Sequence, residues 1–284
     1  MRDGVQILVA IDPMLVLVAK FATLGTNIKI FGWEHTDVEA ALGSKLRVPV
    51  RKFIAKIQIP HVVLTRTAEA GYRSFGLAGK NIRKISNIIP DFGGVRFLES
   101  NKAEVRNGAV FVGRLVASKN VEYLVRIWPE VRRNYPTATL DIIGDGTEYE
   151  KIKIYIEESG QSNYIRLLGR CQVNANLLSR YKIIVSASQL EAQPMSLLEG
   201  ALCGLRVISF AVSDAIVDLC KTGPVGWHHY VENGKKDLFL SAVVDGLDSW
   251  NQKNAMCAIE ALDHQKVNKN IVEEWNEFLE IGRT

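Results

Sequence analysis

Short runs of β-branched and other apolar residues alternate along this chain with segments whose apolar residues recur at helical spacing. The alternation predicts parallel α/β layers, because a parallel strand is reached from its neighbour through a helix. Four strands are expected before residue 90 and five after it. In chain order they are Gln6–Ile11, Ile28–Trp33, His61–Thr65, Lys84–Ile88, Gly108–Val112, Thr139–Ile143, Tyr164–Leu168, Ile183–Ser186 and Leu205–Phe210.

The segment Pro90–Arg106 interrupts this alternation. It is polar, contains Gly93 and Gly94 and has no hydrophobic period, as an interdomain connector would. A chain of 284 residues is long enough for two domains that each have a core. We therefore predict one domain at residues 1–105 and a second at residues 106–284, which ends in mostly helical segments.

Composition disfavours several classes of protein. The apolar runs 6–11 and 14–19 are separated by Asp12 and Pro13, and both are shorter than the ~20 residues of a membrane span. No charged-then-apolar signal peptide opens the chain, so a cytoplasmic protein is expected. A metal or redox framework is not expected, because no C-x-x-C pair occurs among Cys171, Cys203, Cys220 and Cys257.

Basic residues are concentrated in the first half, although the net charge of the chain is only +4. Between Thr36 and Lys84, ten Lys and Arg residues stand against three acidic residues, which gives this stretch a charge of +7. Such an excess predicts an anionic partner. Nucleic acid is not expected to be that partner, since no helix-turn-helix, RNP or zinc-finger pattern accompanies the charge.

Two apolar strands of the second half end in glycine turns. The first leads into Gly113 and Arg114, with Lys119 five residues further on. A glycine there lets the backbone approach a ligand, and two cations can neutralise a diphosphate. The second turn, Gly144-Asp145-Gly146, would present its amides at the carboxyl edge of the sheet, where open α/β folds bind ligands. Taken singly, each is more typical of an ordinary turn with solvated charges.

A third feature extends from Glu191 to Glu199. Pro194 suits the first turn of a helix, and the amides of Met195 and Ser196 would face an incoming phosphate. Carboxylates accept pairs of hydrogen bonds from sugar hydroxyls, so two of them around an amide cluster suit a nucleotide-sugar. The alternative is a helix-dipole partner followed by a solvated helix charge.

Taken in order, these pieces resemble the donor domain of glycosyltransferase family 4, the group 1 glycosyl transferases. The resemblance covers residues 111 to about 218, where five motifs follow in the family's order, a far more specific signal than any one of them. It implies an α/β protein of GT-B fold, with two Rossmann-like doubly wound domains of which the N-terminal one is incomplete. The motifs are G-R-x-x-x-x-K (Gly113, Arg114, Lys119), the glycine turn (Gly144, Gly146), a strand end (Leu168, Gly169), E-x7-E (Glu191, Glu199) and A-x-C-G-x-x-V-I (Ala201 to Ile208).

The resemblance further implies a UDP- or GDP-sugar donor as the substrate of a retaining transferase. Arg114 and Lys119 would hold the diphosphate, Glu199 the ribose, and Glu191 the transferred hexose as a catalytic residue. No D-x-D triplet occurs in the chain, so neither a metal nor another cofactor is expected. The expected donor site comprises Gly113, Arg114, Lys119, Gly144, Gly169, Arg170, Met195, Ser196 and Glu199, with the base near Gly169 and Arg170.

The chain departs from the family pattern at two places. The E-x7-E motif continues with Ala192 and Gln193, where the family usually has Gly and an aromatic or other apolar residue. The family's G-G-x-x-E turn is missing around Ser213 and Asp214. Both departures bear on how the sugar is held more than on how the nucleotide is held.

Histidines of two kinds occur. Phe31-Gly-Trp-Glu-His35 ends a strand and resembles the family's turn that faces the interdomain cleft. His35 would there hydrogen-bond the donor as charge develops, which makes it the second catalytic candidate. A surface histidine is the alternative. His228 and His229 have no partner at metal-ligand spacing and are expected on a surface loop.

The segment Lys45–Lys56 interleaves apolar residues with five cations. A solvated helix face explains this pattern, and in this family context contact with anionic lipid or a lipid-pyrophosphate acceptor explains it comparably well. Pro49 argues against one continuous helix. The expected acceptor is a saccharide or a lipid-linked sugar in surface polysaccharide synthesis, with a peripheral position on the inner face of the membrane.

A competing hypothesis is a non-catalytic chain that binds nucleotide or a partner transferase. Family members normally begin with a glycine-rich strand-turn-helix and two further βα units before the Trp-Glu-His region, which here arrives by residue 33. We therefore expect the chain alone to bind nucleotide but to transfer sugar poorly. A GT-B epimerase is a third and weaker hypothesis, since no acid and base residues for it can be placed.

Overall fold

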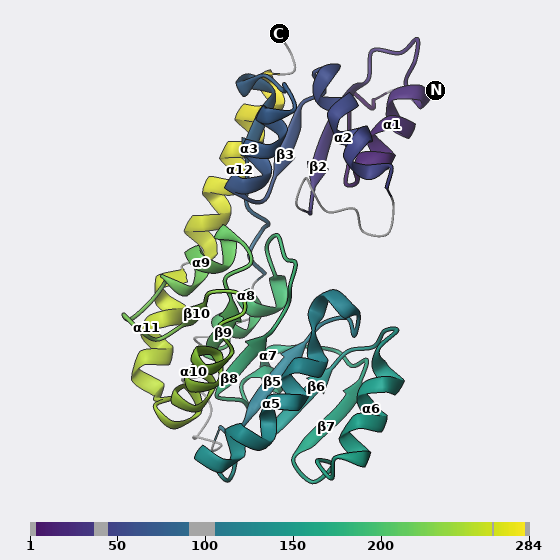
Figure 1. Ribbon diagram of the computed structural model, residues 1–284. Helices are drawn as coiled ribbons and strands as arrows, with labels where there is room; N and C mark the ends of the chain where they lie inside the picture. Colours follow the sequence, from purple (N-terminus) through teal and green to yellow (C-terminus); the bar gives the residue numbers. More distant parts are fainter. Residues whose placement is uncertain (1–3, 37–44, 91–105, 263, 282–284) are drawn as a thin grey trace.

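The computed structural model of the chain describes residues 4–36, 45–90, 106–262 and 264–281. The predicted α/β architecture is confirmed, with two parallel sheets that carry helices on their faces (Figure 1). Each of the predicted strands overlaps an observed strand. The four strands of the first sheet are β1 (Ile7–Ala10), β2 (Lys29–Glu34), β3 (His61–Val63) and β4 (Ile82–Lys84), in the order β1-β2-β3-β4.

Local signals begin the helices that connect these strands. α1 (Pro13–Ala22) starts after Asp12, whose carboxylate accepts a hydrogen bond of 2.8 Å from the second helical amide. α2 (Arg47–Lys56) is one continuous helix, so the expectation that Pro49 interrupts it is wrong. Pro49 lies in the first turn, where backbone amides have no intrahelical acceptor and a missing N–H costs nothing. α3 (Arg66–Ser74) completes the set.

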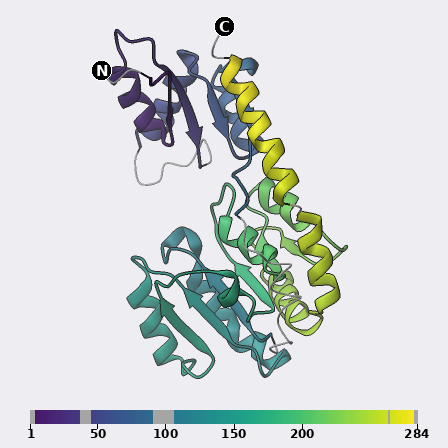
Figure 2. The same cartoon turned by 180° about the vertical axis from the view of Figure 1, so that it is seen from behind.

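The two faces of the first sheet are covered by different parts of the chain. α1, α2 and α3 share one core with it, while α12 (His264–Ile281), the last helix, packs on the other face. The rings of Phe31 and Phe278 meet edge to face, with centroids 5.8 Å apart. Figures 1 and 2 show α12 running along the first sheet after leaving the second domain. The last helix of predicted domain 106–284 thus packs on the first sheet, and the boundary at 105 itself adjoins residues outside the described ranges.

The second sheet has the order β10-β9-β8-β5-β6-β7, so it is doubly wound. The chain adds strands in one direction from β5 and then returns to add strands from β8 in the other, which places a topological switch point between β5 and β8. β10 was not predicted. The strands are β5 (Ala109–Val112), β6 (Leu140–Ile143), β7 (Ile165–Gly169), β8 (Ile183–Ser186), β9 (Arg206–Phe210) and β10 (His229–Val231).

Hydrophobic clusters fill both faces of this second sheet. Along β5, Phe111 belongs to the cluster that includes Trp128 of α5, whereas Val110 belongs to the opposite cluster beneath α8. This alternation is what a strand buried on both faces requires. The helices of this part are α5 (Val121–Asn134), α6 (Tyr149–Glu158), α7 (Ala175–Leu178), α8 (Met195–Leu202), α9 (Asp214–Cys220), α10 (Lys236–Asp248) and α11 (Gln252–Leu262).

The strand predicted at Lys84–Ile88 begins and ends earlier, as β4. The amide of Ile85 still bonds to Val63 O at 2.9 Å, but the amide of Asn87 bonds to the side chain of Gln193 in the second domain. The segment therefore leaves the sheet because its next backbone donor finds an acceptor elsewhere. Of the predicted connector Pro90–Arg106, all residues but these two ends lie outside the described residues.

β1 is an edge strand of the first sheet and pairs only with β2 among the described residues. Beside it, α1 is apolar on both sides. Val16 and Ala19 are buried, but Val18 is 63% exposed and Phe21 is 70% exposed. A helix that is apolar all round is normally buried on all sides. Among the described residues, the first sheet thus has an open edge at β1 next to an exposed apolar face of α1, and the predicted incompleteness of the first domain stays a prediction.

Candidate functional site

Two of the predicted donor-site residues, Lys119 and Glu191, come into contact at the switch point of the second sheet. The loop after β5 includes a short 3-10 turn, Ala117–Lys119, and the loop after β8 leads into α8. A backbone bond of 2.8 Å from Gln189 N to Ser118 O joins the two loops. Crevices at the carboxyl ends of strands on either side of a switch point are where open α/β sheets bind ligands.

Lys119 and Glu191 form an ion pair across this crevice. Lys119 Nζ donates to Glu191 Oε1 at 2.6 Å, and the side chains are 20% and 12% exposed. From the family resemblance, Lys119 is expected at the diphosphate of the donor and Glu191 at its hexose. The structure brings them into direct contact, so an anion that reaches Lys119 competes with Glu191 for it.

The glycines of the site hold neighbouring loops together. A Cβ on Gly144, whose φ is +148°, would lie 1.8 Å from Gly113 O, and no side chain fits there. Gly144 N also donates to Gly169 O at 2.8 Å. A glycine is therefore required at position 144 because the loops after β5, β6 and β7 approach one another closely there. The predicted approach of its backbone to a ligand stays a prediction.

A cavity of about 450 Å³ opens at the carboxyl ends of these strands. Arg114 and Arg170 contribute exposed cations to its wall, and Asp145 is held by accepting a bond of 2.7 Å from Gly146 N. Four of the predicted donor residues therefore line one cavity, namely Gly113, Arg114, Gly144 and Arg170. This size lies within the range of small-molecule sites.

α8 begins at Met195, so Pro194 is the residue before the helix and not, as predicted, part of its first turn. The first backbone bonds of the helix run from Leu197 and Leu198 to Pro194 O, which leaves the amides of Met195 and Ser196 ahead of the hydrogen-bonded turns. The predicted amide cluster is thus present in the backbone geometry. α8 lies close to β8, since a Cβ on Gly200 would be 2.7 Å from Ile184.

Glu199, the fifth of the eight residues of α8, has a partly buried side chain. Burial raises the pKa of its carboxyl above the ordinary value. Among the described residues it has no cation or hydrogen-bond donor as a partner, in contrast to Glu191. A desolvated and unpaired carboxylate is costly in the free protein, and a ligand that brings hydroxyl donors would satisfy it.

His35 lies in the other domain, just after β2, and Figure 2 shows that strand pointing toward the second domain. Its ring lies 4.6 Å from that of Trp33. Burial lowers the pKa of His35, and the Glu34 carboxylate offsets part of the shift, so the imidazole is neutral at pH 7. Within the described ranges, no hydrogen bond or ion pair joins His35 to the donor residues of the second domain.

A buried ion pair that the sequence did not reveal supports the strand end that carries His35. Arg51 Nε donates to Glu34 Oε2 at 3.0 Å with both side chains nearly inaccessible, and Tyr72 Oη lies 3.3 Å from the same oxygen. One cation of the basic segment Lys45–Lys56 is therefore structural. Seventeen residues separate the pair in sequence, and no motif links them.

The expectation that His228 and His229 lie on a surface loop is wrong. His228 is buried and its Nδ1 accepts from Val207 N at 2.9 Å, while His229 begins β10. Burial lowers the pKa of His228 to about 3, which keeps the ring neutral. It supplies an acceptor for the amide of Val207, the second residue of β9, which would be costly if buried without a partner.

The chain is expected to lack a metal site and to contact a membrane only peripherally. Within the described part of the chain, no three His, Cys, Asp or Glu side chains gather as a metal-ligand set. None of the helices described is both long and apolar enough to span a membrane. The expectations of metal independence and of peripheral membrane contact stay predictions.

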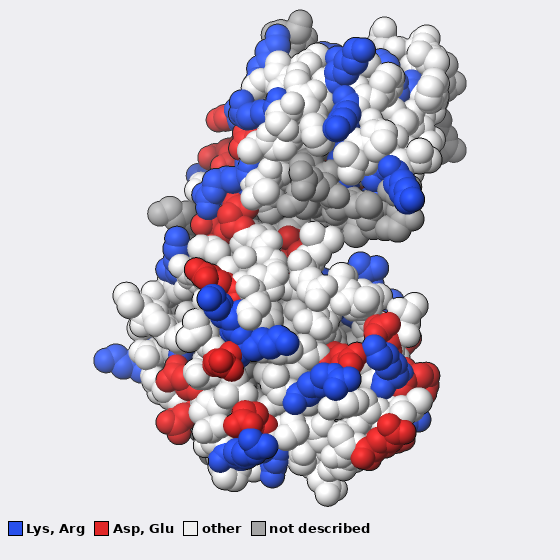
Figure 3. Space-filling view, viewed as in Figure 1, with Lys and Arg blue, Asp and Glu red and all other residues white. Residues whose placement is uncertain are grey.

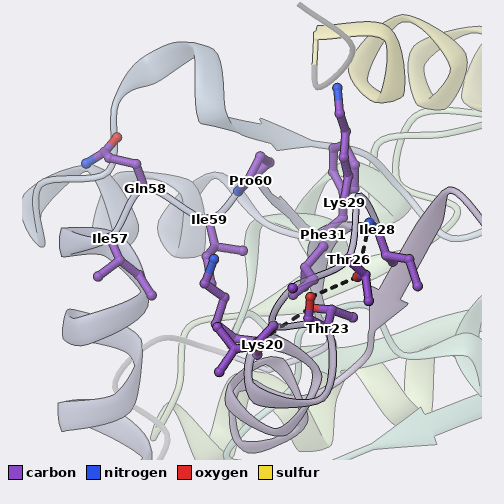
Figure 4. Close-up of a pocket in the computed structure, with 13 residues that line it drawn as sticks. Lys20, Thr23, Thr26, Ile28, Lys29, Phe31, Ile57, Gln58, Ile59 and Pro60 are labelled. Carbon is purple, nitrogen blue, oxygen red and sulfur yellow. Dashed lines mark hydrogen bonds between the residues drawn. The ribbon is translucent and has the colours of Figure 1, made fainter.

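A further cavity, of about 420 Å³, lies in the first domain (Figure 4). It is lined by the ends of α1 and α2 and by the starts of β2 and β3, including Lys20, Lys29 and Gln58. Thr26 Oγ1 donates to Thr23 O at 2.8 Å at one side of it. This is the amino edge of the sheet, opposite the edge where ligands of open α/β sheets bind.

The surface of the first domain is basic on the face seen in Figure 3, with acidic side chains toward its left margin. α2 exposes Lys52, Phe53 and Lys56 within about one helical turn, so it presents cations and an apolar ring together. The second domain in the same view mixes both signs of charge. The uneven charge predicted from the sequence is thus visible on the surface.

Comparisons with known proteins agree on one family. The model of the family described as Glycosyl transferases group 1 matches residues 106–249. An uncharacterized glycosyltransferase of Haemophilus influenzae is 24% identical over 277 residues, which cover 96% of this chain and 75% of that protein. The GtfA subunit of a UDP-N-acetylglucosamine–peptide N-acetylglucosaminyltransferase of Streptococcus gordonii is 32% identical over 142 residues, which cover 48% of this chain and 27% of that protein.

Solved structures give the same result for the fold. A mutant of TarM from S. aureus, in complex with fondaparinux, α-GlcNAc-glycerol and UDP, has a TM-score of 0.74 at 20% identity, covering 97% of this chain and 54% of TarM. Anabaena HepE in complex with UDP and glucose also has a TM-score of 0.74, at 14% identity, covering 96% and 78%. The chain thus spans about half of TarM and about a quarter of the GtfA subunit. These likenesses confirm the predicted GT-B fold.

Proposed function

Because this chain belongs to the group 1 glycosyl transferases, we propose that it binds a UDP-sugar in its second domain and moves the hexose to a saccharide or lipid-linked acceptor. The observation that carries the proposal is the Lys119–Glu191 pair at the switch point, beside the cavity that Arg114 and Arg170 line. UDP is favoured over GDP because TarM, HepE and the pneumococcal GtfA transferase are each described with UDP.

Each part of the donor has matching groups in this arrangement. Arg114 and Lys119 supply two cations for the diphosphate, and the free amides at the start of α8 supply further donors. Glu199 offers its unpaired carboxylate to the ribose hydroxyls. When the diphosphate binds Lys119, Glu191 loses its cation and becomes available to accept hydrogen bonds from the hexose. In the free protein the Glu191 carboxylate is therefore paired with Lys119, and it becomes available to the sugar only when the donor binds.

The proposed reaction breaks the bond between the anomeric carbon and the diphosphate oxygen, whose electron pair leaves with the diphosphate. A bond forms from the anomeric carbon to the acceptor oxygen, and the proton of the acceptor hydroxyl passes to the departing diphosphate oxygen. We propose retention at the anomeric carbon, as in the family that the sequence resembles. Charge grows on the diphosphate during bond breaking, and fixed donors aimed at such charge typically contribute about 10²–10³ each to the rate.

His35 is proposed to act from the first domain as a neutral hydrogen-bond donor to the donor phosphate or sugar. Its lowered pKa means that it adds no full positive charge at pH 7. The basic surface of the first domain, together with exposed Phe53 and Lys56 of α2, supports an anionic lipid surface or lipid-linked acceptor on that side. The proposed setting is surface polysaccharide synthesis at the cytoplasmic face of a membrane.

A second candidate function is a non-catalytic chain that binds nucleotide or a partner. The open edge of β1 and the exposed apolar side of α1 favour it, because a sheet of this kind is normally covered. In this candidate function, the chain binds nucleotide through its second domain but has no working pocket for an acceptor.

Calorimetry of the purified chain against UDP, GDP and their glucose and N-acetylglucosamine conjugates tests the proposal. We expect UDP to bind and a UDP-sugar to bind with a different enthalpy, because the hexose adds hydrogen bonds to the Glu191 carboxylate that the diphosphate has released from Lys119. Absence of binding by every nucleotide would refute the donor site. Binding without hydrolysis of the donor or transfer to any acceptor would select the non-catalytic candidate.

A further inference from the structure

We propose that Gln193 is a positioning residue that couples the sugar-binding loop to the segment joining the two domains. The inference rests on the proposed donor site. Gln193 lies two residues after Glu191 and two before the first residue of α8. Its side-chain Oε1 accepts a hydrogen bond of 2.7 Å from Asn87 N, in the segment that leaves β4 of the first domain. The loop that carries Glu191 is therefore hydrogen-bonded to the segment in which the chain leaves the first domain.

The joining segment is fixed on its other side as well. Ile89 N donates to Asn268 Oδ1 at 2.7 Å, and Asn268 Nδ2 donates back to Ile89 O at 2.7 Å. Asn268 belongs to α12, whose later residues form the core on the far face of the first sheet. Residues 87–89 thus lie between the sugar-binding loop and α12, the helix that packs on the first sheet.

This contact explains why the chain carries a polar residue at a position where the family usually has an apolar one. An apolar side chain at 193 offers no acceptor, and the amide of Asn87 would lose its partner. The Asn87 side chain adds a weak contact, from Nδ2 to Met195 Sδ at 3.6 Å. Asn87 therefore touches both Gln193 and the first residue of α8. A shift of the first domain is thereby transmitted to the residues that follow Glu191 and lead into α8.

Another contact between the domains bypasses the sugar-binding loop and provides a control. Arg66, at the start of α3, pairs with Asp214 at 3.2 Å and with Asp218 at 2.7 Å, on α9. The Arg66 side chain is 61% exposed, so these pairs are screened by solvent. Breaking them loosens the two domains without touching Gln193.

Hydrogen exchange of the joining segment tests the coupling without requiring turnover. In the unsubstituted chain, we expect a saturating UDP-sugar to slow exchange of the Asn87 amide beyond the effect of UDP alone, by about tenfold. Gln193→Leu should abolish that difference, whereas Gln193→Glu, which keeps an acceptor, should preserve it. Asn87→Ala keeps the backbone donor and should also preserve it, as should Arg66→Ala.

Steady-state kinetics supply a second readout that a purely structural role would not change. Gln193→Leu should lower kcat for donor hydrolysis or transfer by about tenfold while the Kd for UDP and the melting temperature stay within error. Equal protection of Asn87 by UDP and UDP-sugar in the unsubstituted chain would overturn the inference, as would its survival in Gln193→Leu. Failure of the donor site itself is recognised separately, because no UDP binding would then be seen by calorimetry.

Discussion

Lys119 Nζ lies 2.6 Å from Glu191 Oε1, and this contact links the loops that follow β5 and β8. The two residues are 72 positions apart in the chain. Their pairing means that the cation proposed for the diphosphate is already partly neutralised in the free protein. Several expectations about the donor site depend on how this pair is exchanged for a ligand.

Replacing Glu191 with Gln should leave UDP affinity unchanged or raise it up to about fivefold, because a partly exposed ion pair contributes only about 0–1 kcal/mol. Lys119→Ala should weaken UDP by about 1.5–3 kcal/mol, the range of a charged hydrogen bond. Titration calorimetry with UDP at low salt measures both. If Glu191→Gln weakened bare UDP as strongly as Lys119→Ala does, Glu191 would have to contact the nucleotide itself.

Glu199→Ala should weaken UDP by about 1.5–3 kcal/mol, far more than Glu191→Ala does, since the ribose loses a charged acceptor. Burial raises the pKa of Glu199. UDP binding should therefore weaken as the pH falls through that raised pKa, at a higher pH than an ordinary glutamate titrates.

The same raised pKa has an opposite effect on stability. The folded chain holds this proton more tightly than the unfolded chain, so the contribution of Glu199 to the free energy of unfolding falls as pH rises from the ordinary pKa through the raised one. Glu199→Gln should remove both pH dependences. A pH profile of UDP affinity that was identical in Glu199→Gln and the unsubstituted chain would contradict the assignment.

Donor binding and any turnover should survive excess chelator, because Arg114 and Lys119 supply the positive charge and no D-x-D triplet is present. Arg114→Ala should weaken UDP by about 1.5–3 kcal/mol even with Mg²⁺ present. UDP affinity measured with EDTA and with Mg²⁺ compares the two cases. A strict requirement for Mg²⁺ or Mn²⁺ would show that the phosphate site has been assigned incorrectly.

Gly144→Ala should reduce the free energy of unfolding by about 2–4 kcal/mol, since its φ is strained for any side chain and its Cβ would meet Gly113 O. Gly169→Ala is the matched control. Gly169 also has a positive φ, of +65°, but no atom lies within 4 Å of its added Cβ, so the cost should be only about 1–2 kcal/mol. Chemical denaturation measures both, and equal costs would remove the argument from close approach.

The exposed apolar side of α1 should make the chain associate with rising concentration. Val18→Glu and Phe21→Glu place charges on that side, at residues 63% and 70% exposed, and should restore monomers without loss of UDP binding. Ile154→Glu, at an apolar residue exposed on α6, is the control and should change nothing. Size-exclusion chromatography with light scattering gives the masses. Persistent association in the α1 variants would place the contact elsewhere.

Much of the second domain could be predicted because its motifs are local. β5, β8 and β9 are short apolar runs, and α8 follows from its helical pattern after Pro194. The donor residues also lie in the order that the family shows. A sequence determines such features by itself, since backbone dihedrals, capping and hydrophobic period act over a few residues.

Contacts between distant residues were decided only by the tertiary structure. The sequence gives no signal that Lys119 pairs with Glu191 or that Arg51 is buried against Glu34. Nor does it indicate that the His228 ring accepts a hydrogen bond from the backbone of β9. The bond between Asn87 and Gln193, which ended a predicted strand early, is of the same kind.

The sequence by itself thus determined the alternation of strands and helices, the family and the set of residues proposed to serve the donor. The tertiary structure decided which of these residues touch, where the last helix packs and which charges are buried. The physical reason is that a side chain's pKa and its hydrogen-bond partners depend on desolvation and on groups brought together by the sheet order. Those groups are separated along the chain by tens of residues, beyond the reach of any local pattern.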